Sequence, residues 1–339
     1  MDARWLDALE PAQRAELLAG LPPPGDGEAA PFAWAHRALC RQGLRLRIAA
    51  TPGRAAAPVV LELRHQPRQR AEAPLLVIDV DAGAHCVLLE THERSASDCA
   101  HPVTQNLHSH IQLGAGARLQ HLRVVAPARA GPDRPPPARH AGARRPLRAG
   151  AGGHRQRLPP AARHACNCAA AARAPSTPPC CCWKASSSTT RCAATWQAAH
   201  SASAVESLVL AQGGARAVSN AYTRIAAGAD EADVRQRLSG IPLGGQPRLT
   251  LRPHLEILHD NVQAAHGATW GALPADALFY ARQRGLDEAS ARALITEGMA
   301  RAVLERGLDD SELLAQWLAS GWLGRRMARQ LQGPTGLTP

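Results

Sequence analysis

The chain has 339 residues, a formal net charge of +11 and nine cysteines, which is enough sequence to bury one large core with smaller attachments. It contains no run of 18 apolar residues, so we expect no membrane-spanning helix, and its first residues lack the basic and apolar segments of a signal peptide. We therefore expect a cytoplasmic location, where the cysteines stay reduced.

The positive charge is concentrated in one stretch. Residues 131–200 carry eleven cationic residues against one acidic residue, Asp133, so this stretch has a net charge of +10 and the rest of the chain +1. The charge therefore does not indicate a nucleic-acid partner for the protein as a whole. A basic nucleic-acid binder acting through 131–200 stays an alternative, but it would need aromatic platforms, and only Trp183 and Trp196 are present there.

The first 50 residues predict a helical N-terminal region. Its apolar residues fall roughly on one helical face, interrupted by Pro11: Trp5, Leu6, Leu9, Leu17 and Leu18. The proline-rich linker at residues 21–27 ends this element.

A short motif recurs through residues 55–271: an aliphatic residue, any residue, then three small residues with glycine in the middle. Its copies begin at Val80, Leu113 and Ile225, and each lies between strand-like apolar runs. Glycine tolerates the positive φ of a sharp corner, and alanines beside it let corners stack closely. The repeat predicts coils stacked into a β-solenoid. The runs 249–251 and 255–257, joined through Pro253, fit the same pattern. A β-sandwich is the structural alternative, but its hairpin-turn dipeptides are scarce.

The stretch 131–200 interrupts this pattern. It holds six of the nine cysteines and no Val, Ile, Phe, Tyr or Met, so it cannot offset its own ordering entropy. Its composition favours translation out of frame, because GC-rich codons in a wrong frame yield these residues. The alternatives are a basic linker and a metal site. The metal site would use Cys166, Cys168 and residues 180–182 near His164, although adjacent cysteines chelate poorly.

The C-terminal residues 272–331 predict a helical domain. Helices are expected from Leu273 to a stop at Gly285, from Asp287 to about Arg306, and over Asp310–Leu318, with a possible last turn at 325–331.

Two adjacent segments carry a family resemblance. Residues 252–271, Arg-Pro-His-Leu-Glu-Ile-Leu-His-Asp-Asn-Val-Gln-Ala-Ala-His-Gly-Ala-Thr-Trp-Gly, resemble the signature of the SufB/SufD family, and residues 277–285 resemble its Ala-Leu-Phe-Tyr segment. Weaker similarity extends through 55–125 and 203–250. The short form with an N-terminal helical region looks more like SufD than SufB. The resemblance implies a mainly β fold, with a right-handed parallel β-helix core and a helical C-terminal domain.

The resemblance also implies partners and a site. Members form a SufB–SufD pair, their helical domains bind the ATPase SufC, and a transient iron–sulfur cluster assembles at the SufB–SufD interface. By this likeness His266 would be the cluster-proximal residue. The family cysteine two residues earlier is Ala264 here, and the second aspartate is Asn261, so His266 would need partner cysteines to complete the site. A histidine capping a turn is the alternative.

The helical segment offers candidate contacts for the ATPase, namely Phe279, Tyr280, Arg284 and Glu297; the aromatic pair and Arg284 could equally be packing residues. The chain lacks a P-loop motif, so we do not expect it to bind nucleotide through one. The resemblance implies a non-catalytic scaffold that has no cofactor when alone.

A carbohydrate-active enzyme on a β-solenoid is the other alternative. It would need paired carboxylates on neighbouring coils, and the predicted strands offer few acids: Asp79, Asp81, Glu90 and Glu256. Four histidines near predicted strands, His92, His108, His110 and His121, have no recognisable ligand spacing, and we expect them on the surface.

Overall fold

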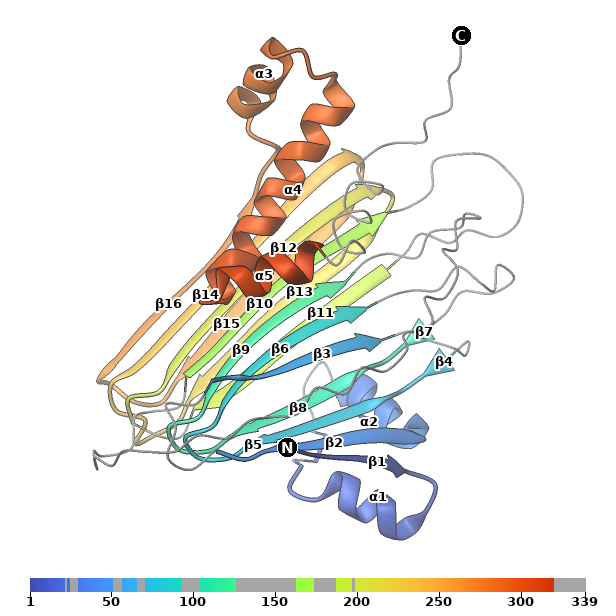
Figure 1. The fold of residues 1–339 in the computed structure, drawn as a ribbon, viewed down its shortest axis with the longest axis vertical. Helices are drawn as coiled ribbons and strands as arrows, with labels where there is room; N and C mark the ends of the chain where they lie inside the picture. The colour runs from blue at the N-terminus through green and yellow to red at the C-terminus, as the bar shows by residue number, and fades with distance from the viewer. Residues whose placement is uncertain are drawn as a thin grey trace.

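The computed structural model describes residues 1–21, 23–24, 30–50, 57–65, 71–92, 104–125, 163–173, 187–196 and 199–319. Its strands stack into an elongated solenoid, with the N-terminal helices at one end and the C-terminal helices lying against one face (Figure 1). The mainly β architecture with parallel sheets confirms the predicted β-helix core.

The elements follow one another along the chain with these bounds. They are β1 (Asp2–Asp7), α1 (Pro11–Leu18), α2 (Ala30–Leu39), β2 (Gln42–Ile48), β3 (Val59–His65), β4 (Ala71–Glu72), β5 (Leu75–Val80), β6 (His85–His92), β7 (Thr104–Gln105), β8 (His108–Leu113), β9 (Arg118–Val125), β10 (Arg163–Arg173), β11 (Ser187–Trp196), β12 (Ala202–Gly213), β13 (Arg216–Ile225), β14 (Ala232–Gly245), β15 (Arg248–Ile257), β16 (Val262–Trp270), α3 (Ala275–Gln283), α4 (Glu288–Gly307) and α5 (Ser311–Ala319).

Two faces build the solenoid. One is a seven-stranded sheet in the order β16-β14-β12-β10-β9-β6-β3. The other consists of a four-stranded sheet, β1-β2-β5-β8, and a three-stranded sheet, β11-β13-β15. Within these sheets every pairing is parallel except that of β1 with β2, as expected when each coil returns to the same face one layer further on.

The glycine corners lie where the repeat predicts them. Gly83, Gly116 and Gly228 have φ values of 71°, 66° and 86°, in the left-handed region that glycine adopts without a Cβ clash. The alanine after each glycine is buried; these are Ala84, Ala117 and Ala229. The motif therefore makes a turn and inserts a small side chain beneath it.

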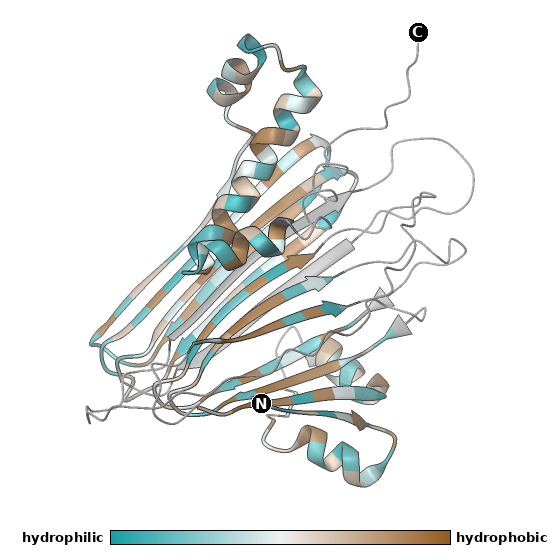
Figure 2. Cartoon of the chain, in the orientation of Figure 1, coloured by the Kyte–Doolittle hydropathy of each residue, from teal (hydrophilic) through white to brown (hydrophobic). Residues whose placement is uncertain are grey.

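Hydrophobic and hydrophilic residues alternate along several strands (Figure 2). Successive side chains of a strand point to opposite faces of its sheet, so the alternation separates the interior of the solenoid from its outer faces. Leu61, Leu88 and Leu119 of the large sheet pack against Leu46 and Ile78 of the opposite sheet. Because side chains alternate, the residues between these positions face outward from the large sheet.

The C-terminal helices cover that outward side. Leu304, Leu314 and Trp317 of α4 and α5 pack on Val87 and Leu122. Further along α4, apolar residues pack on later strands; this second cluster includes Ala300, Val303, Leu208, Leu210 and Ile241. The predicted helices are confirmed to within a few residues, and the predicted last turn at 325–331 lies outside the described residues.

The helix ends have simple local causes. Asp287 caps α4 by accepting a hydrogen bond from the backbone N–H of Ser290 at 2.8 Å. Gly285, with a φ of 85°, follows α3 as predicted.

Two local predictions were wrong. The helix expected from Trp5 onward begins only at Pro11, because Asp2–Asp7 pairs antiparallel with β2 and covers the edge of its sheet. The runs around Pro253 are one continuous strand, β15. Proline is tolerated there because β15 is the last strand of its sheet.

Part of the anomalous stretch 131–200 is described. Strand β10 pairs in parallel with β9 and β12, and β11 pairs with β13. The sites suggested at residues 180–182 and the interval between β9 and β10 lie outside the described residues. The hypothesis of out-of-frame translation stays a prediction. Within the described part of the chain, none of the helices is long and apolar enough to cross a membrane.

Candidate functional site at the open end of the solenoid

His266 lies on β16, the last strand of the seven-stranded sheet. Its register partner is Gln236 on β14, a buried residue. The same register pairs Ala264 with Val234, and Ala268 with Leu238, which are both core residues. His266 therefore continues a ladder of inward-facing positions.

The positions of this ladder on the last strand, β16, are exposed. His266 and Ala264 are exposed although Gln236 and Val234 beside them are buried. The difference arises because β15 and β16 are both edge strands, so in the described chain no further coil covers them. Exposed apolar side chains occur at the same end: Ile257, Leu258 and Trp270. An open strand edge with apolar neighbours can accept another strand.

The substituted family position Asn261 has a structural contact. Its Nδ2 donates a hydrogen bond to Oδ1 of Asp230 at 2.8 Å, and His259 Nε2 lies 3.3 Å from the same oxygen. The hydrogen bond from Asn261, followed by that from His259, lowers the pKa of Asp230. Asn261 thus stabilises the corner between β13 and β14.

The helical candidates are on separate elements from His266. Phe279 and Tyr280 on α3 are 66% and 59% exposed, and the guanidinium carbon of Arg284 lies 3.5 Å from the centre of the Tyr280 ring. Glu297 is half-buried on α4. Helix α3 projects beyond the sheets at the tip of the molecule (Figure 1). The cation–π contact holds Arg284 against Tyr280 while leaving the aromatic surface accessible.

A second group of polar side chains, not predicted from the sequence, lies inside the N-terminal half of the solenoid. The carboxylate of Glu90 is fully buried. His65 Nε2 and His92 Nε2 lie 2.8 Å and 3.0 Å from its Oε1, and His121 Nε2 and Arg123 Nε lie 2.6 Å and 2.7 Å from its Oε2. We call these five residues the Glu90 cluster.

Electrostatics set the charges of this cluster. Burial alone would raise the pKa of Glu90, but the charge of Arg123 and the histidine contacts outweigh it and hold that pKa well below its usual range. Burial lowers the pKa of His92 to about 4 and also lowers that of His121. At neutral pH the carboxylate is therefore ionised, and His92 and His121 are neutral.

The expectation that the four strand histidines lie on the surface is wrong. His121 is buried, and His92, His108 and His110 are half-buried. The sequence carried a usable signal, because Glu90 and His92 continue the alternating inward positions of Cys86 and Leu88. The contact with His65 and His121 depends on the register between coils, which the sequence did not reveal.

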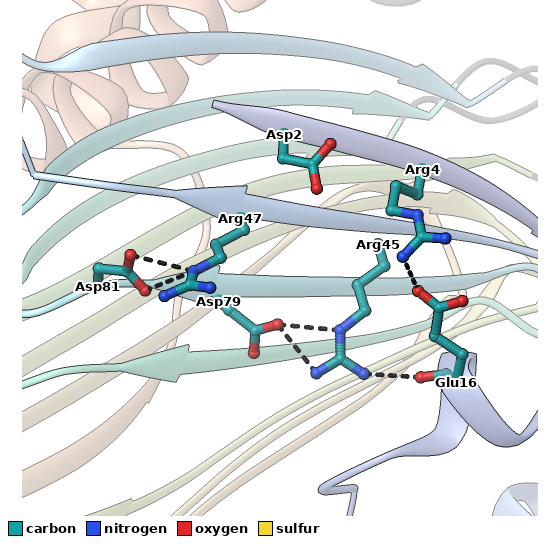
Figure 3. A pocket seen from close by; sticks show the side chains of 7 residues that line it. All are labelled: Asp2, Arg4, Glu16, Arg45, Arg47, Asp79 and Asp81. Carbon is teal, nitrogen blue, oxygen red and sulfur yellow. Dashed lines mark hydrogen bonds and ion pairs between the residues drawn. The ribbon is translucent and has the colours of Figure 1, made fainter.

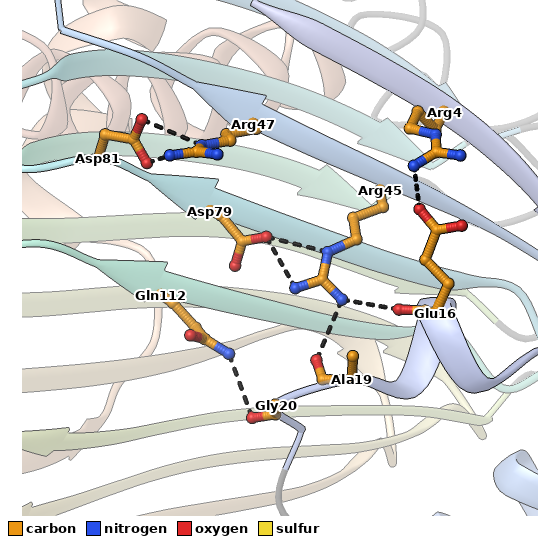
Figure 4. Close-up of polar contacts among 9 residues, drawn as sticks. All are labelled: Arg4, Glu16, Ala19, Gly20, Arg45, Arg47, Asp79, Asp81 and Gln112. Atoms are coloured by element: carbon orange, nitrogen blue, oxygen red, sulfur yellow. Dashed lines mark hydrogen bonds and ion pairs between the residues drawn. The ribbon is translucent and has the colours of Figure 1, made fainter.

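A surface depression on the four-stranded sheet includes residues that attach α1 to that sheet. It is lined by Asp2, Arg4, Glu16, Arg45, Arg47, Asp79 and Asp81 (Figure 3). Arg45 donates from Nε to Asp79 at 3.0 Å and from one terminal nitrogen to the carbonyls of Glu16 and Ala19 at the end of α1 (Figure 4). These contacts fasten α1 to the sheet.

The acidic residues considered for carbohydrate chemistry also form ion pairs or hydrogen bonds with neighbouring side chains. Asp79 and Asp81 pair with Arg45 and Arg47. Glu256 accepts a hydrogen bond from the Tyr222 hydroxyl. These contacts do not supply the pair of open carboxylates that glycoside hydrolysis requires.

The region that contains His266 is similar to a known protein family. Residues 183–299 match the family model described as SUF system FeS cluster assembly, SufBD core domain. This part of the chain is therefore similar to the SufBD core domain, in agreement with the resemblance carried by its motifs.

Three relatives match shorter segments. The iron-sulfur cluster assembly SufBD family protein slr0076 of Synechocystis is 34% identical over 92 residues, covering 27% of this chain and 20% of that protein. The iron-sulfur cluster assembly protein SufD of Escherichia coli is 33% identical over 112 residues, covering 33% and 26%. Protein ABCI7, chloroplastic, of Arabidopsis thaliana is 28% identical over 98 residues, covering 29% and 21%. The matches thus span about a fifth to a quarter of each relative.

Proposed function

We propose that this chain is a non-catalytic, SufD-like scaffold subunit that acts in iron–sulfur cluster assembly in the cytoplasm. The observation that carries the proposal is the open end of the solenoid, where His266 occupies an exposed rung of an otherwise buried ladder. Its segment lies within the part of the chain that matches the SufBD core domain. Similarity to a protein named SufD supports the choice of subunit type.

In this proposal the coil formed by β15 and β16 meets the corresponding end of a SufB-like subunit. Strand edges on both sides would pair, and the exposed side chains of Ile257 and Trp270 would be buried. His266 would then lie at the interface and supply an imidazole ligand to a transient cluster. Because Ala264 cannot bind iron, thiolate ligands would come from the partner.

A SufC-like ATPase would bind the tip formed by α3 and α4. Phe279 and Tyr280 provide exposed aromatic surface, of the type enriched at protein interfaces. Arg284 would contribute charge beside Tyr280, and Glu297 would contribute charge from α4. ATP hydrolysis would belong to the partner.

The interface can be tested by co-expressing the chain with SufB-like and SufC-like proteins. Ala264→Arg places a charge on the exposed rung and should abolish copurification of the SufB-like subunit while leaving binding of the ATPase intact. The control Ala227→Arg alters an exposed alanine at a corner and should change neither. Retained pairing in Ala264→Arg would contradict end-on pairing.

The ligand role of His266 needs a separate measurement. His266→Ala should leave the complex assembled but reduce the visible absorption of the cluster after reconstitution with iron and sulfide. His200→Ala removes another exposed histidine and should reconstitute normally. Equal reconstitution of the two variants would assign His266 to the alternative, a turn residue.

Binding to the ATPase can be tested at the helical tip. Phe279→Ala combined with Tyr280→Ala should weaken it at least tenfold, because aromatic anchors carry much of the binding energy of interfaces. Leu39→Ala removes an apolar side chain that is 61% exposed on α2 and should have no effect. Equal affinities would exclude the α3 surface.

A further inference from the structure

The Glu90 cluster is built from three successive coils. His65 ends β3, Glu90 and His92 lie on β6, and His121 and Arg123 lie on β9. The register places His65 directly beside His92, and Glu90 beside Arg123. All five positions share the inward side of the large sheet with the core leucines Leu61, Leu88 and Leu119. The cluster therefore lies within the solenoid interior, away from β16.

The two carboxylate oxygens of Glu90 have different surroundings. Oε2 accepts hydrogen bonds from His121 and Arg123, which satisfy and orient it. Oε1 faces two imidazole nitrogens, those of His65 and His92. The rings of His65 and His92 stack with centroids 4.5 Å apart and an interplanar angle of 21°, so both rings present Nε2 to the same oxygen.

Two imidazole nitrogens lie within 3.0 Å of Oε1, but their contacts with it differ. His92 makes a hydrogen bond with Oε1 at 3.0 Å. His65 Nε2 is close to Oε1 but is not in hydrogen-bonding geometry, and among the described residues this buried atom has no hydrogen-bond partner. Burying an imidazole nitrogen without a hydrogen-bond partner is unfavourable. In the neutral ring, an unprotonated imidazole nitrogen has a lone pair that can bind a metal ion.

We propose that His65, Glu90 and His92 bind a divalent transition-metal ion. Their three ligand atoms, two imidazole nitrogens and one carboxylate oxygen, all lie within 4.8 Å of one another. This donor set is the one used by two-histidine, one-carboxylate sites, which leave further coordination positions open and accept iron(II), zinc and related ions.

His121 and Arg123 would support the site without being proposed metal ligands themselves. They hold Oε2 and thereby direct Oε1 toward the two imidazoles, as outer-shell partners do at other metal sites. Arg123 also favours the ionised form of the buried carboxylate through its hydrogen bond to Oε2. The site requires no contribution from His266 and is independent of the proposed scaffold function.

The metal can be tested with Co²⁺ on the full chain after removal of bound metals with a chelator. We expect one equivalent of Co²⁺ with the visible absorption of nitrogen and oxygen ligation and no accompanying sulfur charge-transfer band. That spectrum separates the site from any thiolate site among the nine cysteines. Absence of such an equivalent in the wild-type chain would overturn the proposal.

Variants assign the ligands. His65→Ala and Glu90→Gln should each weaken binding of this equivalent by 10-fold or more, while any thiolate-bound ions remain. His108→Ala, which removes a half-buried strand histidine outside the cluster, should bind Co²⁺ as the wild type does. Far-ultraviolet circular dichroism checks that each variant is folded. Undiminished binding in folded His65→Ala would exclude this site.

A stability measurement gives a second readout. A metal that binds only the folded chain raises the thermal unfolding midpoint with its concentration. The Zn²⁺-dependent rise should be lost in His65→Ala and kept in His108→Ala. A rise of equal size in both variants would place the stabilising ion elsewhere.

Discussion

The backbone N–H of Gly83 donates a hydrogen bond to the carbonyl oxygen of Ala115, with a distance of 2.8 Å between nitrogen and oxygen. These residues occupy the corners of consecutive coils, so the bond links one corner directly to the next. The approach is close enough that a Cβ placed on Gly114 would lie 2.5 Å from the backbone nitrogen of Ala82. The solenoid therefore depends on small residues where its corners stack.

Gly114→Ala should separate these corners. We expect the free energy of unfolding to fall by about 1–3 kcal/mol, as in other overpacked sites, because the obstruction is backbone and cannot rotate away. Urea denaturation measures the change. The control Gly298→Ala, in α4 with open space at its Cβ, should instead stabilise the chain by up to about 1 kcal/mol. Similar values for the two variants would contradict close corner packing.

Leu17 anchors α1 to the solenoid. Its side chain is fully buried, and a Cβ on Gly43 would lie 2.5 Å from it. Leu17→Ala should lower the free energy of unfolding by about 2–5 kcal/mol, the usual cost of emptying a core site. Leu9→Ala, at a leucine 66% exposed in the same region, should cost less than about 0.5 kcal/mol. Chemical denaturation followed by tryptophan fluorescence would compare them.

Arg306 fastens α4 to the large sheet. Its guanidinium donates two hydrogen bonds to Glu206, at 2.9 Å and 2.6 Å. Arg306→Ala should cost about 1 kcal/mol, since a bidentate pair is at the upper end of the range for surface ion pairs. Arg301→Ala removes an exposed helical pair with Glu305 and should cost about 0.3–0.5 kcal/mol. A larger loss in Arg301→Ala would show that Arg306 is not the anchor.

A histidine group on the N-terminal side predicts acid sensitivity. His36 is buried, its Nε2 contacts the carbonyl of Pro74, and its ring stacks on His108 at 4.0 Å. Burial, with the nearby charges of His36, His110 and Arg37, lowers the pKa of His108 to about 4. The unfolded chain, with a histidine pKa near 6.5, binds more protons between these values.

Stability should therefore be lost as the pH falls from about 6.5 to 4 and be fully present above 6.5. In His108→Gln the difference between the unfolding midpoints at pH 7.5 and pH 5 should be smaller than in the wild type. His200→Gln, at an exposed histidine, should keep the wild-type difference. An unchanged pH dependence in His108→Gln would remove His108 as a cause.

The sequence predicted the elements whose causes are local. The corner glycines need positive φ, and Asp287 and Gly285 bound their helices. Each of these features can therefore be recognised from the residue itself and its immediate neighbours in the sequence. The family motif around His266 was likewise continuous in the sequence, which is why the candidate residue could be named.

The contacts that were missed depend on pairing between distant strands. Asp2–Asp7 forms a strand because β2 lies beside it, although its own residues suggested a helix. In the Glu90 cluster, Glu90 contacts His65, 25 positions before it, and Arg123, 33 positions after it. Their proximity depends on the lengths of the intervening coils, which composition and periodicity do not determine.

The division of one face into two sheets gives α4 a mechanical role. Among the described strands, the two halves of the solenoid are hydrogen-bonded to each other only through the large sheet. Helix α4 crosses that sheet and packs on apolar residues of both halves, Leu122 in one and Leu208 in the other. Helix α4 therefore holds the two halves of the solenoid in a fixed position relative to each other. A chain shortened before α4 should unfold in two steps instead of one.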